Sequence, residues 1–315
     1  MKQRFIRAAF FCVLVSVNAL LVSSCASQRQ ALQAEEFFAI GMAFFELGRF
    51  SDAEIWLNRA RTANRTMTAS EYNLGRIAFE TGRFEAAALH FEGILRQDPQ
   101  NIMALRGAAY SRIRNGDLEM AEALYERVLA LVPESADGAF NYALVLYAMG
   151  RYEDSEAALL RYPHAMEGNT AALLLFARTQ NALNNVEALD SFDRWLAAET
   201  GTPNPLGLYE YAQLLETSGF FARAIEQFDA ALEALTEDTA ALSRSSVLFG
   251  KARLLLAVDP ENAEGSETLN AAAAAGFSDT EALEALLADE RITSAAREEI
   301  RGIIEEIQAK TSDSE

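Results

Sequence analysis

The residues that could act in catalysis or bind a metal are few in this sequence. Its two histidines, His90 and His164, lie far apart, and neither has a cysteine or a carboxylate at ligand spacing. No Gly-x-Ser-x-Gly motif, phosphate loop or dinucleotide-binding fingerprint is present. Acidic pairs such as Glu305-Glu306 fit solvated helix faces. The sequence therefore predicts no enzyme, no cofactor and no metal site.

Cys25 follows a segment that has the pattern of a secretory signal. Three positive charges, at Lys2, Arg4 and Arg7, precede an apolar run over residues 8–21. That run is too short for a comfortable membrane span, and small residues follow it. We therefore expect a signal peptide over residues 1–24.

The segment Leu21-Val22-Ser23-Ser24-Cys25 resembles the lipobox of bacterial lipoproteins. The resemblance implies that Cys25 is lipidated with acyl chains such as palmitate, becomes the mature N-terminus and anchors the protein to a membrane. Ala26 after it resembles the class of lipoproteins sorted to the outer membrane. An alternative is an ordinary signal peptide cleaved after Ala19, with Cys25 incidental.

Large side chains at helical spacing form the other candidate site. They recur at i, i+4 and i+7 off the expected core positions. Rings offer contact area, and Arg76 and Arg106 could hold carboxylates or backbone carbonyls of a bound peptide. An alternative is that these rings simply pack between adjacent helices. The residues are Phe38, Met42, Phe45, Tyr72, Arg76, Phe79, Arg106, Tyr110, Ile113, Phe140, Leu144 and Tyr147, with Tyr209, Gln213 and Glu216 further along the chain.

Glycine-containing turns separate the helices that would carry these side chains. Gly48, Gly82, Gly116 and Gly150 follow one another at intervals of 34 residues, each between two runs with helical apolar spacing. Each is predicted to adopt a positive φ that ends one helix before the next begins. A fixed period of this length is typical of stacked helical repeats.

Other positions keep the same register. Small residues, from Gly41 to Ala143, stand seven positions before each turn glycine, and large residues follow each turn. Small side chains let the two helices of a hairpin approach closely, whereas large ones fill the space where the next hairpin stacks. Pro99 and Pro133 mark helix ends.

This pattern over residues 34–162 resembles the tetratricopeptide repeat (TPR) family, whose unit has 34 residues. The resemblance implies an all-α fold, a right-handed superhelical solenoid of helix-turn-helix hairpins. It also implies that the side chains on the first helix of each unit line a concave face that binds peptide segments. Ala78 and Arg112 depart from the pattern, because a large aromatic residue is usual there. Phe38 and Met42 replace the Lys and Asn of the family's carboxylate-clamp subtype, so that mode of recognition is not expected.

About six units are predicted over residues 34–238. Asn184 takes the turn position of a degenerate fifth unit, because asparagine tolerates a left-handed backbone. Gly219 is the turn of the sixth.

The 34-residue period fades after residue 238, and residues 239–310 are expected to form a helical C-terminal extension or cap. Helices are expected over residues 241–258 and 264–275, and a capping box at Ser278 to Glu281 opens another. The last helix carries an apolar stripe that includes Ile300 and could seal the end of a solenoid. Residues 311–315 are expected to fray.

Composition agrees with a folded, acidic scaffold. The formal net charge of −19 disfavours nucleic acid as a partner. We expect a membrane-anchored interaction scaffold or adaptor, with its lipidated cysteine and tether at residues 25–33. It would face the periplasm from the outer membrane and hold other envelope proteins by short peptide segments. Alternatives are an accessory of a solute-uptake system, or of outer-membrane protein or pilus assembly.

Overall fold

The structure is a computed structural model that describes residues 29–236 and 241–312, with side chains described up to residue 309. All regular secondary structure in these ranges is helical, which confirms the predicted fold class. The predicted signal peptide, Cys25 and the predicted boundary at residues 238 and 239 lie outside the described residues. The chain forms two compact units, residues 1–165 and 166–315, and each is described by itself.

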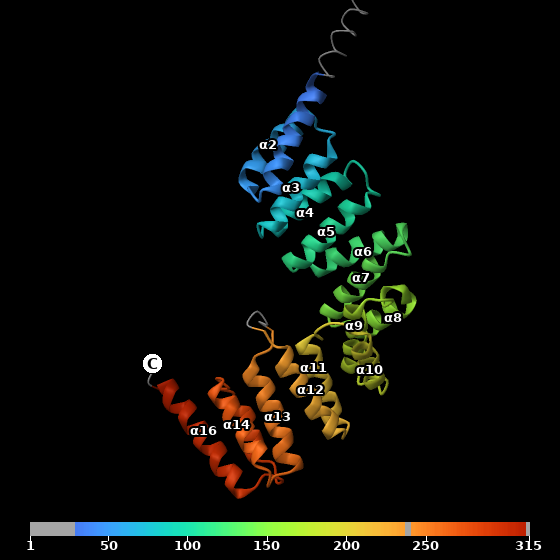
Figure 1. The fold of residues 1–315 in the computed structure, drawn as a ribbon. Helices are drawn as coiled ribbons and strands as arrows, with labels where there is room; N and C mark the ends of the chain where they lie inside the picture. The colour runs from blue at the N-terminus through green and yellow to red at the C-terminus, as the bar shows by residue number, and fades with distance from the viewer. Residues whose placement is uncertain (1–28, 237–240, 313–315) are drawn as a thin grey trace, which may run out of the picture. The chain divides into compact units, whose positions relative to one another are not determined.

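Unit one consists of helical hairpins in its described part (Figure 1). Its first helix covers residues 29–46. From α2 to α8, each α-helix packs against the next one along the chain. The helices are α2 (Phe50–Ala63), α3 (Thr68–Glu80), α4 (Phe84–Leu95), α5 (Ile102–Asn115), α6 (Leu118–Leu131), α7 (Ala136–Ala148), α8 (Tyr152–Arg161) and the short η1 (Pro163–Ala165). α8 is short because Pro163, which cannot donate a helical hydrogen bond, follows shortly after its end.

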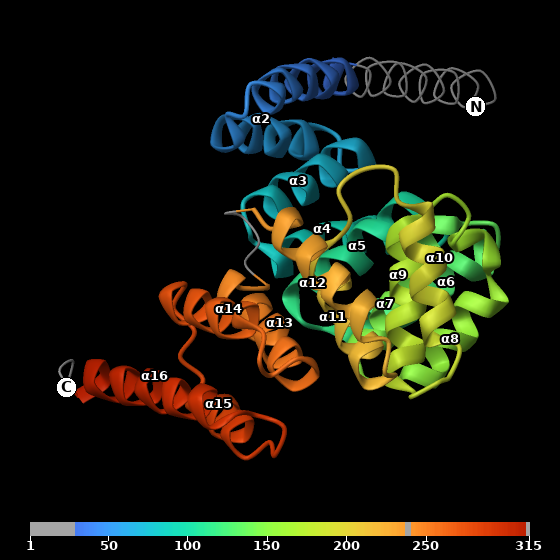
Figure 2. The same cartoon turned by 60° about the horizontal axis from the view of Figure 1, so that its bottom comes forward.

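Unit two continues with hairpins of the same kind. Its helices are α9 (Thr170–Ala182), α10 (Ala188–Ala198), α11 (Pro205–Thr217), α12 (Phe221–Ala234), α13 (Arg244–Val258), α14 (Ala263–Ala274), α15 (Thr280–Leu287) and α16 (Ser294–Ser312). In both views α16 lies beside α14 at the C-terminal end of this unit (Figures 1 and 2).

The turns within the hairpins share one hydrogen-bonded geometry. In the first, the N–H of Arg49 donates to the carbonyl of Phe44 at 2.9 Å, and the N–H of Gly48 donates to Phe45 at 2.9 Å. This pairing requires a left-handed backbone at the turn residue. Asn184 has φ 53°, so its predicted role is confirmed. The turn glycines have φ 69° at Gly48, 74° at Gly82, 88° at Gly116, 75° at Gly150 and 82° at Gly219.

Glycines inside the first helices allow close approach of large side chains from the second helices. A Cβ added at Gly41 would lie 2.8 Å from Cγ of Leu57. One added at Gly75 would lie 2.9 Å from Cζ of Phe91, and one at Gly107 would lie 2.8 Å from Cδ1 of the same ring. Because real Cβ atoms essentially never approach so closely, any larger residue would force Leu57 or Phe91 to shift. The predicted pairing of small and large positions is confirmed.

The C-terminal helices end unit two with an apolar cluster of their own. Ile300, Ile303 and Ile304 of α16 are buried together with Leu283 and Leu286 of α15. The predicted stripe on the last helix therefore does cover apolar surface of the preceding helices.

Two helix starts differ from expectation because a different side chain caps them. Ser243 accepts a hydrogen bond from the N–H of Ser246 at 3.0 Å, so α13 begins at Arg244 and not at residue 241. The predicted capping box at Ser278 is wrong, because Asp279 takes the N-cap position and accepts from the N–H of Ala282 at 3.0 Å. Residues 29–33, the described part of the expected tether, are helical.

The described helices were also compared with the length and hydropathy that a membrane span requires. None of them is both long enough and apolar enough to cross a membrane.

Candidate functional site

The twelve predicted groove residues lie on the first helix of each hairpin in unit one, and we call this set the first-helix face. Three lie on the helix over residues 29–46, and three each lie on α3, α5 and α7. Tyr110 is the exposed member, with 46% of its surface accessible, and the other eleven are half-buried. The face is therefore part packing surface and part open surface.

In three of the four sets the last position holds a ring, which packs against the helix that follows it. The Phe45 ring lies 5.5 Å from Phe50, and the Phe79 ring lies 5.3 Å from Phe84. Tyr110 of α5 stacks on Phe79 of α3 at 5.0 Å. These rings thus form the floor of the face, and Tyr110 presents its other side to solvent.

Arginine side chains join neighbouring first helices across the face. The guanidinium of Arg76 lies 4.5 Å from the centre of the Phe45 ring. Arg106 donates to Oγ of Ser135 at 2.6 Å, and Ser135 is the N-cap of α7. Nε of Arg106 is buried and has no hydrogen-bond partner among the described residues.

Two further residues of α5, Met103 and Arg114, lie beside this face. The i, i+4, i+7 spacing used to select the groove residues does not include them. Met103 is 56% exposed and stands seven residues before Tyr110, two helical turns away. Arg114 lies 4.5 Å from the Phe84 ring and 5.7 Å from the Phe79 ring. Extending the register by one turn in each direction would have found them.

The charge of this region is unbalanced. Within the described residues, the guanidinium groups of Arg76, Arg106 and Arg114 contact rings, an amide or a hydroxyl but no carboxylate. An exposed ring and a thioether thus belong to the same face as three arginines that have no carboxylate partner in the described part of the chain. Such a surface can hold an apolar side chain and carboxylates of a ligand.

The corresponding helices of unit two carry neutralised charges instead. Arg178 of α9 pairs with Glu210 of α11 at 2.5 Å, and Arg253 of α13 pairs with Glu216 of α11 at 2.6 Å. Burial raises the pKa of Glu210 and Glu216, and the arginines oppose that rise. Tyr209 packs its ring on Phe228 at 5.8 Å. This side of unit two therefore offers little unsatisfied charge.

The histidines lie in different surroundings. Nδ1 of His90 on α4 lies 2.9 Å from Oε1 of Glu71 on α3, a pairing that their distance in the sequence hides. The His164 ring lies 6.1 Å from that of Tyr162. Over residues 29–236 and 241–312, no group of three or more His, Cys, Asp or Glu side chains could hold a metal ion.

The sequence is similar to known repeat families. Two sequence profiles described as tetratricopeptide repeats match the chain, one over residues 38–102 and the other over residues 112–178. No curated protein sequence matches it significantly.

Solved structures of similar fold are numerous. A tetratricopeptide repeat protein from Parabacteroides merdae has 19% identity and a TM-score of 0.59, with 81% of this chain and 98% of that chain covered. PilF from Pseudomonas aeruginosa has 17% identity and a TM-score of 0.56, with 77% and 97% covered. A MamA structure has 18% identity and a TM-score of 0.51, with 53% and 92% covered. At these identities the likeness concerns the fold, and it agrees with the predicted solenoid of helical hairpins.

Proposed function

We propose that this chain, which contains tetratricopeptide repeats, is a membrane-anchored scaffold of the bacterial envelope that holds segments of other proteins. Repeats of this kind indicate a protein–protein interaction scaffold, because stacked hairpins offer an extended surface rather than a closed catalytic cavity. The binding region is the first-helix face of unit one.

The observation that carries this proposal is the open part of α5. Met103 and Tyr110 expose apolar surface, while three neighbouring arginines have no carboxylate partner among the described residues. The chain as a whole is strongly acidic, with a formal net charge of −19. A peptide segment that combines an apolar side chain with carboxylates fits this chemistry, since rings and guanidinium groups favour both.

The anchor is supported by the sequence of the N-terminus. The apolar run over residues 8–21 and the lipobox-like segment before Cys25 favour a lipid-anchored protein. Ala26 favours the outer membrane, with the repeats facing the periplasm. An anchored scaffold would then meet its partners close to the membrane surface.

The binding region can be tested by crosslinking in intact envelopes, followed by purification of the bait. The test variant is Met103→Ala with Tyr110→Ala, and the control is Leu89→Ala with Leu160→Ala. The control residues are exposed on α4 and α8, 49% and 60% respectively, and lie outside the first-helix face. We expect a stoichiometric protein partner with the wild type and the control, and its loss with the test variant.

Two results would contradict the binding region. One is a partner that survives the test substitutions while circular dichroism shows all variants folded. The other is recovery of no protein partner, together with binding of a small solute that the test variant loses. The second result would favour an accessory role in solute uptake.

The anchor has its own test. Cys25→Ala should move the protein from the membrane fraction to the soluble fraction, because the lipid is attached at that sulfur. Retention of Cys25→Ala in the membrane fraction would show that the anchor lies elsewhere.

A further inference from the structure

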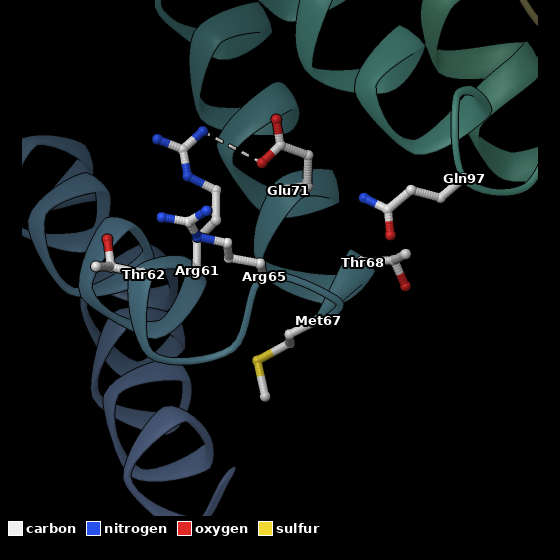
Figure 3. A pocket seen from close by; sticks show the side chains of 7 residues that line it. All are labelled: Arg61, Thr62, Arg65, Met67, Thr68, Glu71 and Gln97. Carbon is white, nitrogen blue, oxygen red and sulfur yellow. Dashed lines mark hydrogen bonds and ion pairs between the residues drawn. The ribbon is translucent and has the colours of Figure 1, made fainter. Parts of the chain in front are cut away.

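A polar pocket of about 270 Å³ lies between the first two hairpins of unit one. Its walls come from the end of α2 and the loop after it, the first turns of α3, and the loop after α4 (Figure 3). The lining residues are Arg61, Thr62, Arg65, Met67, Thr68, Glu71 and Gln97. None of them belongs to the first-helix face.

The repeat itself shows that arginine is not needed here for folding. The positions equivalent to Arg61 in the next two hairpins are Leu95 and Leu129, both buried. Those equivalent to Arg65 are Pro99 and Pro133. The same backbone therefore forms with apolar residues at both positions, and the two arginines of the first hairpin call for another explanation.

The charges around the pocket do not cancel. Arg61 reaches Glu71 with Nη1 at 3.2 Å and Asn58 with Nη2 at 2.7 Å. Glu71 is also bonded to His90 at 2.9 Å, so its two oxygens are already engaged. The Arg65 guanidinium has no ion pair or hydrogen bond among the described residues. The pocket thus keeps an excess of positive charge in a chain that is acidic overall.

The donors suit one class of group. In Figure 3 both arginine side chains extend from the end of α2 and its loop, on the opposite side of Glu71 from Gln97. Guanidinium forks match the oxygens of carboxylates and phosphates. A tetrahedral phosphate has enough oxygens to accept hydrogen bonds from both forks at once. A planar carboxylate, with two oxygens, uses fewer of these donors.

We propose that this pocket binds a phosphate group, held by Arg61 and Arg65. Glu71 positions Arg61 through the hydrogen bond from Nη1. The pocket volume accommodates a phosphate together with neighbouring atoms of a larger molecule.

The test is calorimetric titration of the full-length protein in a non-ionic detergent with inorganic phosphate, at constant ionic strength. Arg65→Gln removes a guanidinium that makes no hydrogen bond or ion pair with a described residue, so folding should be unaffected. Arg59→Gln is the matched control, because Arg59 precedes the pocket on α2 and stacks on Trp56 at 4.4 Å instead. We expect saturable binding that Arg65→Gln weakens about tenfold or more, since charge-assisted hydrogen bonds contribute roughly this much. Arg59→Gln should leave the affinity unchanged.

The proposal is overturned by any of three results. These are no saturable binding by the wild type, equal affinity of the wild type and Arg65→Gln, or the same heat signal from chloride at equal ionic strength.

The source of the phosphate is resolved by two further titrations. Glycerol 3-phosphate represents a free phosphomonoester, and glycerophosphoglycerol represents the diester headgroup of an anionic lipid. Tighter binding of the monoester identifies a soluble ligand, whereas tighter binding of the diester identifies a lipid surface. Absence of binding by both overturns the proposal.

Discussion

Arg112 occupies a position where a large aromatic side chain is usual in tetratricopeptide repeats, yet it is 5% exposed. Its guanidinium lies 2.6 Å from Glu85, 2.7 Å from Glu92 and 2.9 Å from Asp117. Burial opposes its charge, but the hydrogen bonds with Glu92 and Asp117 outweigh burial and raise the pKa of Arg112. The side chain thus replaces ring packing with a charged network that joins two hairpins.

Removal of this buried charge should be costly. Arg112→Ala leaves three carboxylates without their partner, so we expect a loss of roughly 2–4 kcal/mol in the free energy of unfolding. The lower part of that range allows for the partial exposure of Glu85. Arg83→Ala, which breaks the exposed pair with Glu54, should cost less than about 1 kcal/mol. Urea unfolding of both variants measures the difference, and equal losses would contradict this account.

Glu71 should give the protein a pH-dependent contribution to stability. The hydrogen bond with His90 is the main cause that lowers its pKa from the ordinary value of 4.5, against the opposing effect of burial. A carboxyl group whose pKa is lower in the folded state stabilises the fold above its unfolded pKa. This contribution is lost as the pH falls below about 4.5 and through the folded value. The difference in unfolding free energy between wild type and Glu71→Gln should therefore shrink between pH 5 and pH 3. A difference that stays constant across that acid range would contradict the assignment.

Helix pairs and their turns were largely predictable because each is specified within a few residues. The turn glycines and Asn184 stand where a left-handed backbone is required, and that requirement limits which residues can occupy the position. Helix starts were harder to place. Ser278 and Asp279 are both good caps, and only the folded chain decides which side chain reaches the free N–H group.

The site was predictable in outline and not in detail. Helical spacing placed the twelve groove residues on first helices, but it could not decide which rings remain open. Tyr110 stays exposed because it lies on top of Phe79, whereas Phe79 is covered by Phe84 and Tyr110. The contact between Glu71 and His90 joins two helices, so neither spacing nor residue type reveals it.

The glycines that meet large side chains should not tolerate a methyl group. Gly75→Ala places a Cβ 2.9 Å from the Phe91 ring, which also lies close to Gly107. We expect a loss of roughly 1–3 kcal/mol from overpacking, although alanine favours a helix. Gly302→Ala on α16 meets nothing within 4 Å, so it should stabilise by roughly 0.5–1 kcal/mol. Thermal unfolding separates the two, and a stabilised Gly75→Ala would show that the ring can move.

At the scale of the whole molecule, a row of hairpins leaves an uncovered apolar surface wherever it stops. In unit two α16 supplies the cover, with Ile300 fully buried against the preceding helices. A solenoid without such a cover is prone to self-association.

Ile300→Asp should therefore affect both stability and association state. A buried, unpaired carboxylate in this cluster is expected to cost at least about 3 kcal/mol and to expose apolar surface. Gln308→Asp adds the same charge at an exposed position of the same helix. Light scattering should find larger species for Ile300→Asp and a mass unchanged from the wild type for Gln308→Asp. If the two variants behave alike, α16 is not a cover.

The Phe91 ring also limits how this protein can be recombined. The ring requires glycine at two places, Gly75 in its own hairpin and Gly107 in the next. The residues at the register of Gly107 in the neighbouring hairpins are Asn73 and Asn141. The second hairpin can therefore be followed by the third, but it would clash if exchanged with its neighbours or duplicated in place. Hairpins that share one period are thus not interchangeable. The order of the second and third hairpins is fixed because the Phe91 ring needs a glycine in each of them.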